Sequence, residues 1–199
     1  MSEYSITHLL LAAGASTRMG RPKQLLNWRG QSLIRHSVQN IQKAELAERI
    51  VVVLGAKQEE IVPELNDLNV EVVVNSDWES GMGSSIRCGV EYALQDAPNG
   101  WEGIFISLVD QPLVQAAHYQ EIFQVWREHF PAVVAAQYNG ILGVPALFGQ
   151  PFFSKLLQLN GAVGARKILA QAEGVIPVSI PEAVFDLDTP EDYEELVSG

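Results

Sequence analysis

A segment near the start of the chain carries the residues best suited to bind an anion. An apolar run stops at Ala12-Ala13-Gly14, and a loop of small residues with the cations Arg18, Arg21 and Lys23 follows. Small residues let a ligand approach the backbone closely. Free loop N–H groups beside Arg and Lys side chains form a site suited to phosphates. The segment therefore predicts a strand, a phosphate-binding loop and a helix that starts near Ser32.

The spacing within this loop differs from the two commonest phosphate-binding motifs. Five residues separate Gly14 from Gly20, and Arg21 follows, so the P-loop pattern is not met. Ser16 stands where the dinucleotide fingerprint needs its second glycine. A βα loop whose cations are simply solvated is the alternative interpretation.

Three aspartates follow apolar runs and could work together with these cations. Asp110 comes directly after such a run, although Pro112 also fits a helix cap. Asp186 and Asp188 are two residues apart, so they would point to the same side of a persisting strand. A helix cap at Asp188 or Thr189 is the alternative. Mg²⁺ is typically held by one or two carboxylates plus substrate phosphates, so these parts suit nucleotidyl transfer.

Another loop, Gly81–Ser85, precedes a helical pattern. Its glycines would let a flat base lie on the backbone, and Ser84 or Ser85 would cap the helix in the simpler interpretation. Cys88 is expected to be a small buried hydrophobic residue. The histidines show no metal-ligand spacing: His8, His36, His118 and His129.

Apolar, β-branched runs alternate with helical patterns along the chain. Helical spacing is found around residues 33–41, 86–94 and 122–126. Strands are predicted at residues 6–11, 49–54, 70–74, 103–109 and 132–136, with shorter runs at 144–148, 175–180 and 184–187 that could include antiparallel edge strands. This order predicts an α/β fold, a Rossmann-like three-layer sandwich with a mostly parallel central sheet.

Bulk properties restrict the possible partners. A length of 199 residues predicts a single domain over 1–199. The net charge of −11 argues against nucleic acid as a partner, yet residues 1–35 hold five Arg or Lys and one acidic residue, which favours a small anionic ligand. No apolar run is long enough to span a membrane. The single cysteine and the lack of a signal-peptide pattern lead us to expect a cytoplasmic protein.

Several motifs in order resemble one known family. They are LLLAAGASTRMGRPKQLL, VVVNSDWESGMGSSIRCGV, SLVDQPLV, GVPALFG, LNGAVGARKIL and FDLDTPEDY. Together they resemble the MobA-like nucleotidyltransferases, in the branch of the molybdenum cofactor cytidylyltransferases. The resemblance implies the fold of the nucleotide-diphospho-sugar transferases and Mg²⁺-dependent transfer of a nucleoside monophosphate, with pyrophosphate as the leaving group.

The resemblance also implies roles for particular residues. Lys23, Arg18 and Asp110 would be catalytic, and Asp110 and Asp188 would bind the metal, with Asp186 a less certain ligand. The implied nucleotide-binding residues are Leu11, Ala12, Ala13, Gly14, Arg18, Lys23, Asn75, Gly81, Met82, Gly83, Ser84 and Ser85. The Ala-Ala-Gly start and the GMGSS loop match the branch that uses CTP.

Two positions depart from the family pattern. Val144 stands where the family usually has histidine, and Ala162 where it usually has an acidic residue. Both lie toward the half that would bind the acceptor, which is implied to be a phosphorylated pterin. Alternatives are the same chemistry with another nucleotide or acceptor, and a non-catalytic protein that binds or delivers the molybdenum cofactor. A molybdoenzyme would then be a delivery partner.

Overall fold

A computed structural model describes residues 4–95, 100–162 and 164–198. Its sheets contain strands at β1 (Ile6–Ala12), β2 (Asn27–Trp28), β3 (Gln31–Ser32), β4 (Arg49–Leu54), β5 (Glu71–Val74), β6 (Gly103–Leu108), β7 (Val133–Tyr138), β8 (Ile141–Gly149) and β9 (Ile176–Ser179). Its α-helices are α1 (Leu33–Ala44), α2 (Gln58–Ile61), α3 (Met82–Gln95), α4 (Ala116–Glu128), α5 (Phe153–Leu157), α6 (Ala165–Gln171) and α7 (Pro190–Ser198). Short 3₁₀ turns are η1 (Thr17–Met19), η2 (Lys23–Leu25), η3 (Val62–Leu65), η4 (Trp78–Ser80), η5 (Gln150–Phe152) and η6 (Pro181–Val184).

The main sheet of the described residues has the strand order β5-β4-β1-β6-β8-β7-β9. Strand β1 lies in the interior of the sheet and pairs in parallel with β4 and β6. The sheet is mostly parallel, and only the pairs that β8 makes with β6 and β7 are antiparallel. The carboxyl ends of β1, β4 and β6 therefore meet at one edge, which is where α/β sheets place their ligands.

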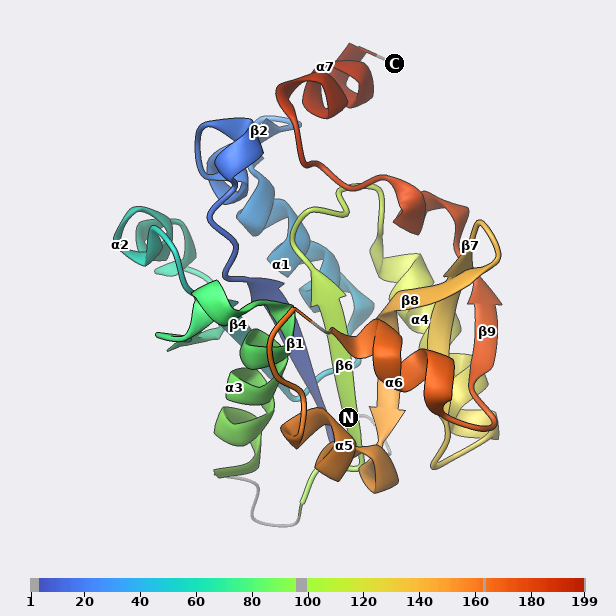
Figure 1. Ribbon diagram of the computed structural model, residues 1–199. Coiled ribbons are helices and arrows are strands. Elements are labelled where there is room, and N and C mark those ends of the chain that lie inside the picture. Colours follow the sequence, from blue (N-terminus) through green and yellow to red (C-terminus); the bar gives the residue numbers. More distant parts are fainter. Residues whose placement is uncertain (1–3, 96–99, 163, 199) are drawn as a thin grey trace.

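Helices cover both faces of this sheet, as Figure 1 shows. Side chains of α1 and α4 pack with Leu10 and Phe105 in one hydrophobic cluster. Side chains of α3, α5 and α6 pack with Leu9 and Ile106 in a second cluster on the opposite face. Neighbouring strand residues point to opposite faces, so the strands of a sheet covered on both sides are apolar throughout. The expected three-layer α/β fold is confirmed.

Two expectations about the later strands need correction. The antiparallel strand β8 does not lie at an edge, because it sits between β6 and β7 and is buried through most of its length. Residues 184–187 are not a strand: η6 ends at Val184, and the chain then runs without regular structure to α7. The pleat argument for Asp186 and Asp188 therefore does not apply.

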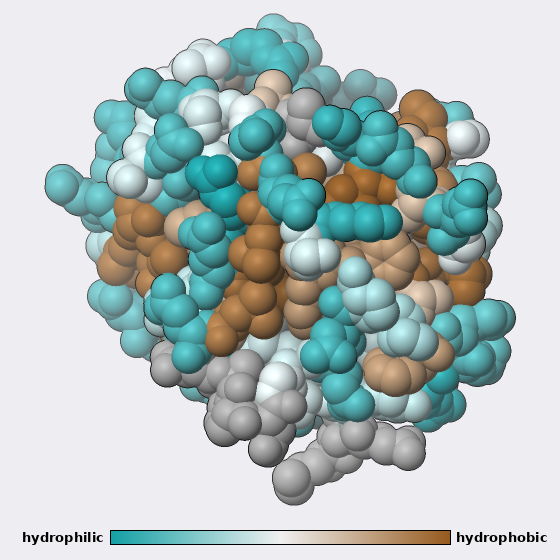
Figure 2. Space-filling model, turned by 60° about the horizontal axis from the view of Figure 1, so that its bottom comes forward, coloured by the Kyte–Doolittle hydropathy of each residue, from teal (hydrophilic) through white to brown (hydrophobic). Residues whose placement is uncertain are grey.

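The surface is mixed in character. Figure 2 shows hydrophobic residues in short groups that are bordered by hydrophilic ones. Large apolar residues that are exposed are Val74, Met82, Phe130, Ile141, Phe185 and Val197. Scattered exposed residues of this kind are normal in soluble domains. In the part of the chain that the structure describes, no helix is both long and apolar enough to cross a membrane.

Candidate active site

The loop after β1 is held in place by the side chain of Gln24. This side chain is buried, and its Nε2 donates hydrogen bonds to the carbonyl oxygens of Ala12 at 2.7 Å and Gly14 at 3.1 Å. Ser16 accepts a hydrogen bond from the backbone N–H of Lys23 at 3.0 Å. The loop thus returns on itself and places Lys23 near the end of β1. Gln24 was not among the site residues predicted from the sequence.

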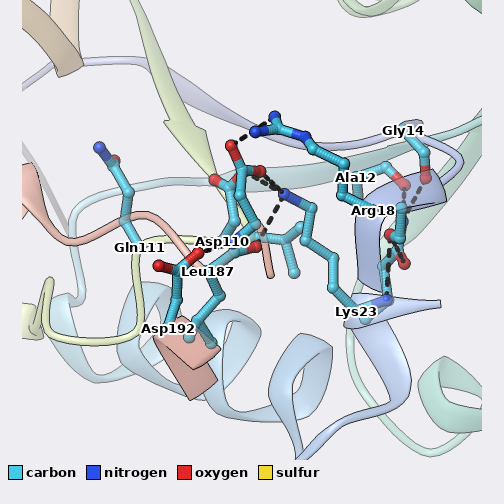
Figure 3. A network of polar contacts seen from close by, with 12 residues as sticks. Ala12, Gly14, Arg18, Lys23, Asp110, Gln111, Leu187 and Asp192 are labelled. Atoms are coloured by element: carbon cyan, nitrogen blue, oxygen red, sulfur yellow. Dashed lines mark hydrogen bonds and ion pairs between the residues drawn. The ribbon is translucent and has the colours of Figure 1, made fainter. Parts of the chain in front are cut away.

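Lys23 joins two carboxylates that are remote from it in the sequence. Its Nζ lies 2.7 Å from Asp110 Oδ2 and 2.8 Å from Asp188 Oδ1. It also donates to the carbonyl oxygen of Leu187 at 3.0 Å. Figure 3 shows these groups converging on the lysine from the end of β6 and from the segment before α7. The predicted catalytic lysine and the two predicted metal ligands therefore form one cluster.

Among the other cations of residues 1–35, Arg18 shares a partner with Lys23, while Arg21 and Arg35 contact residues away from the cluster. Arg18 is largely exposed and lies 2.8 Å from Asp188. Arg21 lies over the ring of Tyr193, and Arg35 pairs with Asp67. Arg18, Lys23 and Arg35 are thus matched by acidic residues from later in the chain. Only Arg18 and Lys23 meet at the cluster.

The helix-cap alternatives for the aspartates are also decided. Asp110 is not a cap, because α4 begins only at Ala116 and has Gln115 at its N-cap. Thr189 caps α7: its Oγ1 accepts the Asp192 N–H at 3.2 Å, and the Asp192 carboxylate accepts the Thr189 N–H at 2.7 Å. This reciprocal arrangement is a capping box. It leaves the side chain of Asp188 available to the cations.

The ionisation of the cluster reflects opposing effects. Burial disfavours the ammonium of Lys23, but Asp110 and Asp188 outweigh it and raise the pKa of Lys23. Partial burial disfavours the carboxylate of Asp188, yet Lys23 and Arg18 hold the pKa of Asp188 below its usual value. Both groups are therefore charged at neutral pH, and Lys23, though not Asp188, is shielded from water.

Asp186 differs from Asp188 despite its position two residues earlier. It lines a different hollow from the one beside Lys23. Burial raises the pKa of Asp186 to about 6, and the negative charge of Asp110 adds to this effect. With no strand over residues 184–187, the chain turns the two side chains to different surroundings.

The first hollow, of about 310 Å³, lies beside the cluster. Of the residues predicted to bind a nucleotide or metal, those that line it are Leu11, Ala12, Ala13, Gly14, Lys23, Gly81, Met82, Ser85 and Asp110. Its lining also includes residues that the sequence analysis missed, namely Ala15, Gln24, Trp78, Glu79, Leu108 and Val109. Trp78 and Glu79 lie within a motif quoted for the family resemblance, which was the available signal for them.

The predicted base loop is built around Asn75. Its Nδ2 donates hydrogen bonds to Ser84 Oγ at 2.8 Å and Ser85 Oγ at 3.0 Å, and all three residues are buried. Ser84 and Ser85 lie inside α3, so neither is its N-cap. Asn75, Gly83 and Ser84 do not line the first hollow. Their contact with a base stays a prediction. The hydrogen bonds between Asn75 and the two serines hold the loop in place.

Gly81 joins this loop to the segment between α5 and α6. Its φ of +118° is a conformation that favours glycine. A Cβ at this position would lie 2.6 Å from the Cα of Ala162. The N–H of Gly83 also donates to the carbonyl oxygen of Gly161 at 3.0 Å. A larger residue at position 81 would therefore push two loops of the site apart.

A second hollow, also of about 310 Å³, adjoins the first and shares Leu11, Met82 and Leu108 with it. Its remaining lining residues are Ile86, Ile106, Gln111, Tyr138, Gly143, Val144, Ala162, Gly164, Ala165, Arg166 and Asp186. Both positions that depart from the family pattern, Val144 and Ala162, are among them. The departures thus fall in one place, separate from the lysine cluster.

The carboxylates of the cluster are suited to a divalent cation. One oxygen each of Asp110 and Asp188 already converges on a single positive charge. The other oxygen of Asp110, Oδ1, is buried and has no hydrogen-bond partner. Buried polar atoms usually have a partner, and a bound cation is one kind of partner that would satisfy this oxygen. Among the described residues, no three or more His, Cys, Asp or Glu side chains are grouped so as to hold a metal.

Comparison with known proteins agrees with this geometry. The family model of the MobA-like NTP transferase domain matches residues 8–175. The chain belongs to this family. It is similar to the molybdenum cofactor cytidylyltransferase of Escherichia coli K12, with 26% identity over 191 residues, which are 95% of this chain and 94% of that protein. The protein is therefore a MobA-like nucleotidyltransferase, as its motifs indicated.

Two further relatives of this MobA-like transferase are informative. The crystal structure of Rv0371C from Mycobacterium tuberculosis, in complex with manganese, superposes with a TM-score of 0.80 at 26% identity, covering 98% of this chain and 99% of that one. The nicotine blue oxidoreductase of Paenarthrobacter nicotinovorans is 40% identical over 108 residues, which are 54% of this chain and 50% of that protein.

Proposed function

We propose that this protein transfers CMP from CTP to the phosphate of a molybdopterin-type acceptor and releases pyrophosphate, with Mg²⁺ as its metal. The observation that carries this proposal is the cluster of Lys23, Arg18, Asp110 and Asp188 beside the first hollow. Cations next to paired carboxylates are the groups that a nucleoside triphosphate and its metal require.

The residues of the chain have distinct tasks in this reaction. The backbone of Ala12, Ala13 and Gly14 lines the hollow and would meet the base and ribose. An oxygen of the acceptor phosphate forms a bond to the α-phosphorus of CTP, and the bond to the β-phosphate oxygen breaks. Because the acceptor phosphate is already an anion, no general base is needed. Lys23 and Arg18 would stabilise negative charge on the phosphates as pyrophosphate leaves.

Asp110 and Asp188 would hold the metal, which supplies charge neutralisation and orientation of the triphosphate when bound. A manganese complex of a relative at 26% identity supports a divalent metal in this fold. The unpartnered oxygen of Asp110 supports the same assignment from within this chain. The choice of Mg²⁺ follows from its preference for few carboxylates and several phosphate or water oxygens.

The second hollow is the natural place for the acceptor, since it shares a wall with the first. Its lining is apolar along Leu11, Ile86, Ile106 and Leu108, while Gln111 and Arg166 supply polar groups. A pterin is a flat ring system with polar edges, and this lining would accommodate it. Val144 and Ala162 remove a histidine and an acidic residue that the family usually has here, so a different phosphorylated acceptor is the first alternative.

Pyrophosphate release tests the proposal. Purified protein with Mg²⁺ and a molybdopterin-type acceptor should release pyrophosphate from CTP, and more slowly from GTP. Equal or faster use of GTP would contradict the assignment of CTP. A thermal-shift series of nucleoside triphosphates with Mg²⁺ should show the largest rise in Tm for CTP, because a ligand that binds only the native state stabilises it.

Two other outcomes would favour other functions. Binding of the cofactor without pyrophosphate release from any triphosphate would favour a protein that binds or delivers it to a molybdoenzyme. Failure to bind any nucleoside triphosphate would favour a function closer to the relative named as an oxidoreductase, which matches about half of this chain.

A further inference from the structure

The ammonium of Lys23 uses all of its hydrogen bonds within the protein. Lysine has three N–H donors, and here they face Asp110 Oδ2 at 2.7 Å, Asp188 Oδ1 at 2.8 Å and the carbonyl oxygen of Leu187 at 3.0 Å. The side chain of Lys23 is only 11% exposed. In this state no donor of Lys23 is directed at a phosphate in the first hollow.

The proposed function needs a different arrangement of the same groups. Lys23 would have to face the phosphates, and the two carboxylates would have to face the metal. Asp110 Oδ2 and Asp188 Oδ1 converge on the point that Lys23 Nζ now holds, so a metal shared by the two carboxylates would take that point. The unpartnered Asp110 Oδ1 would then be a further oxygen for the same ion. Mg²⁺ lies about 2.0–2.1 Å from its oxygen ligands, and it repels an ammonium at the same position. The metal and the Lys23 ammonium therefore exclude one another.

We propose that Lys23 is the resident cation of this carboxylate pair, and that the metal replaces it when a nucleotide arrives. The inference rests on the proposed function, since it needs a metal between Asp110 and Asp188. Before the nucleotide binds, Lys23 keeps the two like charges together. When a triphosphate enters, it draws the ammonium away, and the carboxylates accept the metal.

The charges of the cluster explain why the metal should not bind well alone. Arg18 and Lys23 balance Asp110 and Asp188, so the four side chains have no net charge. A metal that arrives without a nucleotide must displace a shielded ammonium that has no other anion to contact. A triphosphate provides that anion. Metal and nucleotide should therefore increase one another's affinity by the same factor, as linkage requires.

A Mn²⁺ titration without nucleotide tests the exchange, with free Mn²⁺ followed by electron paramagnetic resonance. Lys23→Met keeps most of the length of the side chain and removes its charge. We expect this variant to bind Mn²⁺ alone at least about tenfold more tightly than the parent, which corresponds to about 1.4 kcal/mol. The same variant should lose pyrophosphate release, because its phosphate-binding cation is gone.

Matched variants locate the effect. Adding Asp110→Asn to Lys23→Met should remove the gain in Mn²⁺ affinity. Lys167→Met, which changes an exposed lysine on α6, should bind Mn²⁺ as the parent does. Lys23→Gln provides a second neutral variant whose amide can still bond to the carboxylates, in case Lys23→Met does not fold.

The outcomes separate this inference from the proposed function. If the parent binds Mn²⁺ with CTP, but folded Lys23→Met and Lys23→Gln gain no affinity for Mn²⁺ alone, the exchange is wrong and the proposed function stands. If the parent binds no Mn²⁺ with any nucleoside triphosphate, the metal assignment fails and the inference fails with it.

Discussion

At the scale of single residues, the loop after β1 depends on one amide. Gln24 is buried, and it is the donor to the carbonyl oxygens of both Ala12 and Gly14. With these carbonyls turned toward Gln24, the loop keeps one shape before any ligand arrives. A loop that is already ordered loses less conformational entropy when it binds. Gln24 is thus a positioning residue for the backbone that lines the first hollow.

Replacing Gln24 with methionine should weaken nucleotide binding more than it slows turnover. The change keeps the volume of the side chain, but it leaves two carbonyl oxygens without their donor. The loss of two such hydrogen bonds corresponds to a roughly ten- to hundredfold rise in the KM for CTP. Steady-state kinetics would measure the split between KM and kcat. Gln120→Met removes a side-chain hydrogen bond to the Ala44 carbonyl oxygen, far from the site. This control should leave both KM and kcat unchanged. If Gln24→Met has the same KM for CTP as the parent, Gln24 does not position the loop for nucleotide binding.

At the scale of elements, the site forms where the ends of several segments lie close together. Strand β6 ends just before Asp110, and the Leu187 N–H donates to the carbonyl oxygen of Asp110 at 2.9 Å. This bond fastens the segment before α7 to the central sheet. Figure 1 shows that segment passing near the loop after β1. The capping box at Thr189 then fixes where α7 begins, and Asp188 lies directly before it.

Asparagine substitutions should rank the three aspartates by their surroundings. Asp110→Asn and Asp188→Asn keep the side-chain shape but remove charge from the cluster. Each should lower pyrophosphate release by about a hundredfold or more. Asp186→Asn should act more mildly, because Asp186 faces the second hollow. A Mg²⁺ titration of activity compares all three with the parent. Asp67→Asn, in the surface pair with Arg35, is the control. If Asp110→Asn keeps the rate and the Mg²⁺ dependence of the parent, the assignment of the metal site to Asp110 is wrong.

At the scale of the whole molecule, a buried histidine links the central strands to α4. His8 on β1 is stacked on Phe105 of β6 at 4.8 Å, and its Nε2 lies 2.8 Å from Ser107 Oγ. The ring of Tyr119 on α4 meets it edge-on at 5.0 Å. Burial lowers the pKa of His8 to about 3. The folded protein therefore keeps His8 neutral in a region where the sheet and helix pack together.

This histidine should make the fold sensitive to mild acid. In the unfolded chain His8 takes up a proton near pH 6.5, but in the folded protein it does not until about pH 3. Its contribution to stability is therefore complete above pH 6.5 and decreases as the pH falls. The loss should be about 1.4 kcal/mol of unfolding free energy per pH unit.

Urea unfolding between pH 6.5 and 5 would measure this slope. Glutamine does not titrate, so the unfolding free energy of His8→Gln should lack the contribution of His8 to this slope. The difference in unfolding free energy between the parent and His8→Gln should therefore change by about 1.4 kcal/mol per pH unit. His129→Gln, at an exposed position, should follow the parent. Parallel pH profiles for the parent and His8→Gln would show that His8 is not the group responsible.

The sequence by itself determined those features that depend on neighbouring residues. Apolar, β-branched runs such as Arg49–Leu54 form strands because they fit a sheet that is covered on both faces. The small residues after β1, the helix that follows Ser32 and the position of Asp110 after β6 were predicted for the same local reason. The order of these elements sufficed for the fold class, and several motifs in sequence sufficed for the family.

Only the tertiary structure decided which charged groups meet. Lys23 is 87 positions from Asp110 and 165 from Asp188, and the sequence pattern does not specify ion pairs across such separations. The divergence of Asp186 from Asp188 depends on a segment that is not a strand, because η6 and the cap at Thr189 set its path. Strand β8 became an interior strand through its pairing with both β6 and β7. Local patterns limit what each segment can form, while packing between remote segments determines what each side chain contacts.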